Sequence, residues 1–132
     1  MRCRLISAAL ALISVATVGA ARNRGVDGRG VLGAIAKAPA KARTWKNPYG
    51  DDLGAIAAGA KLYRQHCAEC HGEDARGMGH AADLYSSGVQ NATPGELAWF
   101  LRNGNLASGM PSWSGLPEQR RWQIVSYLKT LK

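Results

Sequence analysis

Apolar residues recur at steps of three and four after Asp51 and Asp52, which is the spacing of one face of an α-helix. Either aspartate can accept hydrogen bonds from the first free backbone amides and so begin the helix. Small residues at positions 57–59 would let another helix approach closely. The predicted buried face consists of Leu53, Ile56, Ala60 and Tyr63.

A second helix is predicted between Thr93 and Gly104. Thr93 and Glu96 have the spacing of a capping box, and Pro94 occupies the first helical position, where its missing amide removes no hydrogen bond. Gly104 is typical of a helix end. The residues expected to face a core are Leu97, Phe100 and Leu101.

A third helix is predicted from Pro117 and Glu118 towards the C-terminus, with Lys129 and Lys132 near its negative end. Its apolar stripe consists of Ile124, Tyr127, Leu128 and Leu131. Since no run of four or more residues has the alternation of a strand, the predicted fold class is all-α, with three to four helices.

Residues 1–21 have the pattern of a signal peptide. Arg2 and Arg4 precede an apolar run at 5–21, which ends in small residues suitable for cleavage. A membrane anchor is the alternative, but this run would span roughly 26 Å as a helix, short of the ~30 Å hydrocarbon core. We therefore expect a cleaved leader and a periplasmic protein. Cys3 would leave with the leader, which excludes a disulfide framework.

Residues 22–50 are expected to form a basic flexible linker that precedes a folded domain at 51–132. They contain many Gly, Ala, Lys and Arg residues and few large aliphatic ones, and Pro39 and Pro48 interrupt helices. Trp45 and Tyr49 are the exception, because two aromatic rings among turn-forming residues could fold back onto the domain.

The net charge of +8 comes entirely from the first 50 residues, since basic and acidic residues balance from Asp51 onward. A globular nucleic-acid-binding face is therefore not expected. The domain itself has one Phe and few long aliphatic residues, a thin core for a domain of this size. Something other than side chains must fill its centre.

Cys67-Ala68-Glu69-Cys70-His71 is the pattern of c-type haem attachment. Two thiols three residues apart lie on one side of a helical turn and can form thioethers with one porphyrin, and the adjacent His71 can ligate its iron. A thioredoxin-like dithiol would require a preceding strand. A zinc site would need further ligands, for which only His66 and His80 remain, both close in sequence.

Over residues 53–131 the chain resembles the class I cytochrome c family. Cys67, Cys70 and His71 match the family's haem motif, Gly109-Met110-Pro111 matches the loop with the distal methionine, and Trp113 fits an aromatic residue near that loop. Two pairs resemble the residues at which the family's N-terminal and C-terminal helices cross: Gly59 with Tyr63, and Ile124 with Tyr127. The short separation of His71 and Met110 suggests a compact bacterial type with one haem c.

Met110 is expected to be the distal iron ligand, because a thioether is a soft neutral donor and the residue lies in an irregular segment between two helices. Met78 and His80 are rivals, but they follow the haem motif closely and would have to cross to the other haem face. His66 is expected to point to solvent.

With His71 and Met110 as ligands, the iron would have no open coordination position, so we expect an electron carrier and not an enzyme. Its expected partners are a dehydrogenase that donates electrons or a terminal oxidase or reductase that accepts them. Two alternatives remain: a haem subunit fixed within a dehydrogenase complex, and a gas-binding or enzymatic haem protein with an open sixth position.

The leader yields a first testable prediction. The mature N-terminus should fall near Ala21 or Arg22, because the apolar run is short for a membrane span and ends in small residues. Intact mass measurement of the exported protein checks this. Protein purified from membranes with Met1 still present would contradict it.

Overall fold

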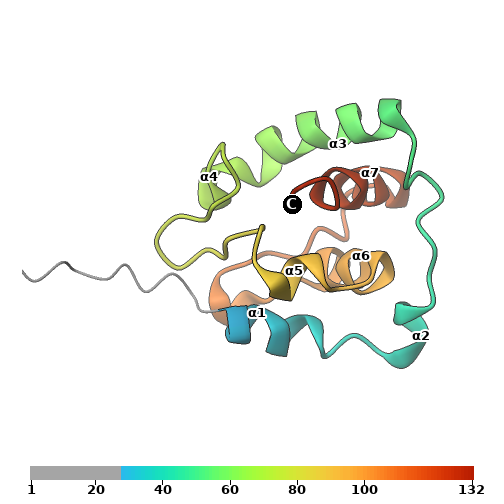
Figure 1. Ribbon diagram of the computed structural model, residues 1–132. Helices are drawn as coiled ribbons and strands as arrows, with labels where there is room; N and C mark the ends of the chain where they lie inside the picture. Colours follow the sequence, from blue (N-terminus) through green and yellow to red (C-terminus); the bar gives the residue numbers. More distant parts are fainter. Residues whose placement is uncertain (1–27) are drawn as a thin grey trace, which may run out of the picture.

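The computed structural model describes residues 28–132, and within this range the chain is helical and contains no β-strand (Figure 1). The elements are α1 (Gly28–Ile35), α2 (Ala40–Arg43), α3 (Leu53–His66), α4 (Ala68–His71), α5 (Ser87–Gln90), α6 (Pro94–Asn103), the 3-10 helix η1 (Leu106–Ser108) and α7 (Glu118–Leu128). The all-α prediction is confirmed, and the three predicted helices correspond to α3, α6 and α7.

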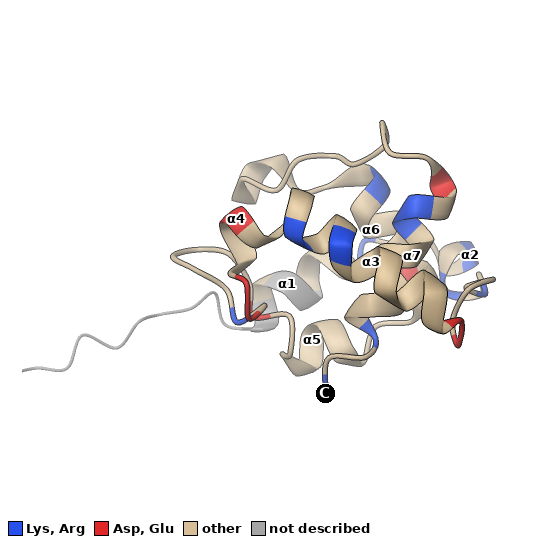
Figure 2. Ribbon diagram, turned by 90° about the horizontal axis from the view of Figure 1, so that it is seen from above, with Lys and Arg blue, Asp and Glu red and all other residues tan. Residues whose placement is uncertain are grey.

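The helices form two layers. Figure 1 shows α3 beside α7 in one layer, with α1, α5 and α6 in the other. Lys129, just after α7, joins the layers by donating to the carbonyl oxygen of Ala92 at 3.1 Å and to that of Gln90. Charged residues of both signs lie on the helices, with basic residues on α3 and an acidic one on α4 (Figure 2).

Helix α3 begins as predicted, and its predicted buried face is confirmed in part. Asp52 is its N-cap and accepts a hydrogen bond from the Ala55 amide at 3.0 Å. Leu53, expected in the core, is 81% exposed. The residues that are buried are Ala55, Gly59, Leu62 and Tyr63. Tyr63 is therefore buried as predicted, and Ile56 and Ala60 are half-buried. Only Leu53 was placed wrongly, because the prediction followed a large side chain of the first turn, whereas the contact that orients the helix is made by small residues.

Gly59 makes that contact. A Cβ atom at this position would lie 2.0 Å from the carbonyl oxygen of Gln123 and 3.0 Å from Cβ of Tyr127, so the backbones of α3 and α7 touch. One turn further on, the rings of Tyr63 and Tyr127 pack with their centroids 5.3 Å apart. The predicted crossing of the two helices at these positions is confirmed.

Helix α6 follows the sequence signals closely. The Thr93 hydroxyl accepts from the Glu96 amide at 3.2 Å, and the Glu96 carboxylate accepts from the Thr93 amide at 2.8 Å, which completes the capping box. The helix ends at Gly104, whose φ of 69° lies in the region that glycine adopts at low cost. Leu97 and Leu101 are buried, as predicted.

The flexible linker predicted for residues 22–50 is wrong for the described part, residues 28–50. This segment contains α1 and α2, and Ile35 and Ala42 are 4% and 0% exposed. Trp45 and Tyr49 pack against the core, as their aromatic character suggested. Small alanine side chains account for the error, because a helix that approaches its neighbours closely can be buried without large aliphatic residues.

The predicted leader, residues 1–21, lies outside the described residues. Among residues 28–132, none of the helices has the length and apolar character needed to span a bilayer.

The contact at Gly59 leads to a second prediction. Gly59→Ala should lower the free energy of unfolding by about 1–3 kcal/mol, because the backbone of Gln123 must move away from the new methyl group. Urea denaturation measures this change. Gly115→Ala is the matched control, since a Cβ there meets nothing within 4 Å. Equal stability of the two variants would contradict the assigned helix contact.

Candidate functional site

The haem-attachment motif forms a single helical turn at the end of α3. Cys67 is the C-cap of α3 and the N-cap of α4. Its carbonyl oxygen accepts hydrogen bonds from the amide of Cys70 at 3.1 Å and from that of His71 at 2.9 Å. This turn brings both cysteines and the histidine to one side, as the spacing predicted. Cys67 is half-buried and Cys70 is exposed.

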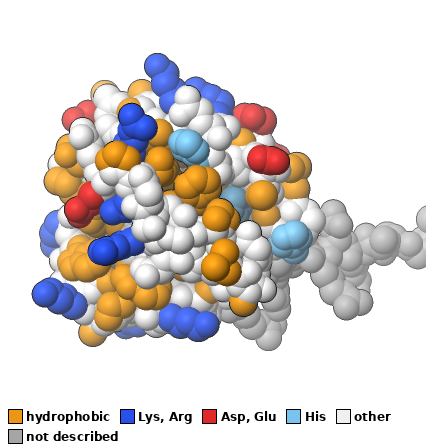
Figure 3. Space-filling view, turned by 180° about the vertical axis from the view of Figure 1, so that it is seen from behind, with side chains coloured by type: hydrophobic (Ala, Val, Ile, Leu, Met, Phe, Trp, Pro, Cys, Tyr) orange, Lys and Arg blue, Asp and Glu red, His pale blue; other side chains and the backbone are white. Residues whose placement is uncertain are grey.

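A cavity of about 300 Å³ opens beside this turn. The four predicted site residues, Cys67, Cys70, His71 and Met110, all line it. Its remaining walls are largely aliphatic and aromatic and come from both layers; they include Ile35, Val89, Leu97, Leu101, Ile124 and Leu128. Seen from behind, histidine side chains lie among hydrophobic ones on one face (Figure 3). The cavity therefore suits a large apolar group with a few polar or soft attachment points.

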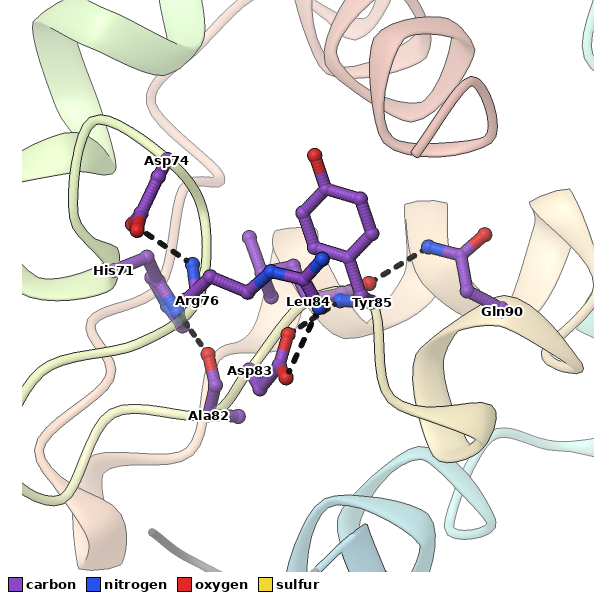
Figure 4. A network of polar contacts seen from close by, with 8 residues as sticks. All are labelled: His71, Asp74, Arg76, Ala82, Asp83, Leu84, Tyr85 and Gln90. Carbon is purple, nitrogen blue, oxygen red and sulfur yellow. Dashed lines mark hydrogen bonds and ion pairs between the residues drawn. The ribbon is translucent and has the colours of Figure 1, made fainter. Parts of the chain in front are cut away.

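A hydrogen bond holds the His71 ring in one orientation. Its Nδ1 lies 2.9 Å from the carbonyl oxygen of Ala82 (Figure 4). A carbonyl oxygen only accepts, so Nδ1 must carry the proton. The lone pair of the ring is therefore on Nε2, the atom left free to ligate a metal.

The loop that presents Ala82 is held by its own contacts (Figure 4). The Arg76 guanidinium lies 3.7 Å from the centre of the Tyr85 ring and forms a 3.7 Å ion pair with Asp83. At the far end of the loop, the side chain of Gln90 donates to the Leu84 carbonyl oxygen at 2.7 Å. These contacts keep the carbonyl oxygen of Ala82 in place for the His71 ring.

Tyr63 supports the same turn from α3. Its hydroxyl donates to the carbonyl oxygen of Gly72 at 2.6 Å, and the side chain is only 1% exposed. Burial, and to a lesser extent the neighbouring Cys67, raises the pKa of Tyr63 well above its ordinary value. The hydroxyl therefore remains protonated and able to donate at any physiological pH.

Met110 lies on a short loop that closes on itself. The amide of Asn105 donates to the Met110 carbonyl oxygen at 2.9 Å, and the amide of Met110 donates to the Asn105 carbonyl oxygen at 3.1 Å. Between them are η1 and Gly109, whose φ of 80° is the left-handed conformation. Gly104 packs against the backbone of Pro111, since a Cβ there would lie 2.5 Å from its carbonyl oxygen. The loop thus approaches α6 too closely to shift freely.

The chain that follows Met110 is hydrogen-bonded to two helices, α6 and α7. The amide of Trp113 donates to the Leu101 carbonyl oxygen at 2.9 Å, and the Ser112 hydroxyl donates to that of Arg102. Arg121, on α7, donates to three carbonyl oxygens of this segment, those of Trp113, Ser114 and Leu116. These hydrogen bonds hold the segment next to Met110 against α6 and α7.

The other candidate ligands occupy different surroundings. Met78 is 54% exposed and does not line the cavity. His80 is exposed and lines the cavity. Its Nε2 lies next to Gly109, since a Cβ added at Gly109 would be 3.3 Å from it. The position of His80 in the sequence had suggested that it would lie away from the loop that carries Met110.

His66 was expected to point to solvent, and this expectation is wrong. The residue is half-buried and its ring packs against Trp113, with centroids 5.3 Å apart. The close approach of the methionine loop to the end of α3 provides this aromatic neighbour, which no local sequence signal reveals.

The cysteine environment disfavours the alternative chemistries. Burial, with a smaller contribution from Cys70, raises the pKa of the free Cys67 thiol to about 11, whereas reactive redox thiols have lowered values. In the described part of the chain, His, Cys, Asp and Glu form no group of three or more suited to a metal ion. Two thiols, an oriented imidazole and a thioether around an apolar cavity fit haem c well.

Comparisons with known proteins agree with this chemistry. Residues 54–128 match the family model described as "Cytochrome C oxidase, cbb3-type, subunit III". Cytochrome c550 of Pseudomonas aeruginosa is 31% identical over 139 aligned positions, which cover 99% of this chain and 93% of that protein.

Two further relatives match smaller regions. Quinohemoprotein alcohol dehydrogenase ADH-IIG of Pseudomonas putida is 39% identical over 83 residues, which cover 59% of this chain and 11% of the dehydrogenase. The crystal structure of cytochrome CL from Methylophaga aminisulfidivorans matches with a TM-score of 0.55 and 26% identity, covering 63% of this chain and 57% of that one.

The hydroxyl of Tyr63 provides a third prediction. Tyr63→Phe should lower the free energy of unfolding by about 1 kcal/mol, because the buried carbonyl of Gly72 loses its partner. Urea denaturation at neutral pH measures the loss. Tyr85→Phe is the control, since among the described residues its hydroxyl has no hydrogen bond, and equal losses in the two variants would contradict the assignment.

The same residue predicts a pH dependence. Because the pKa of Tyr63 is raised in the folded protein, the unfolded chain loses its phenolic proton first as the pH rises. Stability should therefore fall above about pH 10, the ordinary tyrosine value, and Tyr63→Phe should reduce that fall.

Proposed function

The chain belongs to the cytochrome c family, whose members carry covalent haem c and transfer electrons, and on that premise we propose that it is a periplasmic carrier of single electrons. In this proposal Cys67 and Cys70 form thioethers with one haem c, and His71 and Met110 ligate its iron. The haem supplies an iron that alternates between the ferrous and ferric states. The chain's own residues determine its attachment, ligands and surroundings.

The observation that carries the proposal is that two oriented donors line one cavity. His71 has a free Nε2 because its Nδ1 donates to Ala82, and Met110 is on a loop closed by backbone hydrogen bonds. Two such ligands leave no position for a substrate or a gas molecule. Rigid ligands also favour fast electron transfer, because the surroundings need little rearrangement when the charge changes.

The apolar walls of the cavity should favour the reduced state. Ferric haem carries one more positive charge than ferrous haem, and a site that excludes water stabilises that charge poorly. A methionine ligand acts in the same direction. The carrier should therefore accept electrons readily from a dehydrogenase and pass them to a terminal oxidase or reductase.

Similarity to part of an alcohol dehydrogenase supports a dehydrogenase as the electron donor. The same similarity favours a second candidate function, a haem subunit held permanently within a dehydrogenase complex. Purification of the native protein separates the two, because a mobile carrier would be recovered alone and a fixed subunit together with its enzyme.

The proposed ligand role of Met110 gives the fifth prediction. The oxidised wild-type protein should show the weak near-infrared band of methionine sulfur bound to iron, and the reduced protein should bind carbon monoxide slowly or not at all. Met110→Ala should abolish the band, admit carbon monoxide and lower the reduction potential by about 59 mV or more, a tenfold change in the redox equilibrium. Absorption spectra and redox titration measure these changes.

Met78→Ala is the matched control, because Met78 is exposed and does not line the cavity. It should leave the band, the potential and carbon monoxide binding unchanged. Loss of the band in this variant, or rapid carbon monoxide binding by the wild type, would overturn the ligand assignment and favour a gas-binding or enzymatic protein. Covalent attachment is measured separately, by the mass of the denatured chain.

A further inference from the structure

The segment before α3 forms part of the cavity wall. Gly30, Ala34 and Ile35 of α1 line the cavity, and the last two are 8% and 4% exposed. Helix α1 packs against α5 and α6 (Figure 1). We call residues 28–49 the strap. It lies wholly outside residues 54–128, the part of the chain that matches the family model.

The middle of the strap is anchored on α6. Gly95 packs directly on α2, since a Cβ there would lie 1.9 Å from the Ala42 carbonyl oxygen and 2.9 Å from Cβ of Trp45. Beside this contact, the Arg43 guanidinium lies 3.0 Å from the Glu96 carboxylate. A backbone contact this close is possible only where α6 has glycine.

The end of the strap is anchored on α7. The Asn47 side chain donates to the Ser126 hydroxyl at 2.9 Å, and that hydroxyl donates to the Tyr49 carbonyl oxygen at 2.8 Å. Ser126 is only 2% exposed, so these hydrogen bonds are shielded from water. Both α6 and α7 therefore hold the strap, and α1 at its start packs on α5 and α6 beside the cavity.

We propose that the strap is part of the haem-binding site and that α1 shields the haem from water. Ile35 contributes an aliphatic side chain to a wall that otherwise comes from Val89, Leu97 and Leu101. Without α1 this wall would be open to solvent, which stabilises the more charged ferric state. The strap therefore raises the reduction potential and slows the reaction of ferrous haem with oxygen. The inference rests on the proposed haem site.

The test loosens the strap without changing a cavity residue. In Gly95→Ala, the new methyl group must displace the backbone at Ala42 and move α2 away from α6. At a fixed ambient potential, the ratio of reduced to oxidised protein should fall by roughly threefold or more. Autoxidation of the ferrous protein should accelerate by a similar factor. Gly115→Ala is the control, because a Cβ at this position meets nothing within 4 Å and the residue lies outside both the strap and the cavity, so both quantities should stay unchanged.

A second variant reaches the wall directly. Ile35→Ala should change the potential and the autoxidation rate in the same directions as Gly95→Ala, because it removes the aliphatic side chain from the cavity. Leu53→Ala is its control, since Leu53 is 81% exposed and lies outside the cavity. All variants are compared as full-length, haem-loaded proteins, with helix content checked by circular dichroism.

The inference is wrong if Gly95→Ala and Ile35→Ala both keep the reduction potential and the autoxidation rate of the wild type while their helix content is retained. Equal changes in the two controls would also overturn it. Either result leaves the near-infrared band of the wild type intact and so differs from a failure of the proposed function. A wild-type chain without covalent haem would overturn the proposed function and the inference together.

Discussion

The backbone contact between α3 and α7 at Gly59 is the constraint on which the rest of the structure depends. It brings Tyr63 against Tyr127 and sets Ile124 and Leu128 along one wall of the cavity. The same contact directs the end of α3 towards the cavity, where the turn at residues 67–71 begins. A domain of this size has too few large aliphatic side chains to fill its own core. The cofactor therefore supplies the apolar volume that the side chains do not.

The two proposed iron ligands are positioned by backbone groups. His71 depends on the carbonyl oxygen of Ala82, and Met110 on hydrogen bonds with Asn105 and on the close packing of Gly104. Backbone groups in a folded loop move little, which suits a site whose iron must change charge with little change in geometry. Side chains such as Arg121 act indirectly, because they hold the segment that follows Met110.

The strap lies outside the part of the chain that matches the family model, yet it lines the same cavity. It is held on α6 through Gly95 and on α7 through Ser126, both within the matched region, while the cavity wall that it completes lies on α1. In the proposed arrangement, the cofactor site depends on a segment whose composition resembles that of a linker. Arg43 and Glu96 link the two regions at the surface, where the pair contributes less than the buried contacts beside it.

The sequence by itself determined the all-α class, the bounds of α6 and the grouping of Cys67, Cys70 and His71, because capping boxes and short motif spacings act between residues a few positions apart. Gly59 as a helix-crossing residue and Met110 as a candidate ligand were suggested by the resemblance to a family. Only the tertiary structure decided that Ile35 belongs to the cavity, that Leu53 faces outward and that His66 packs on Trp113. These outcomes depend on which backbones can approach closely, and that is settled by contacts between residues far apart in the chain.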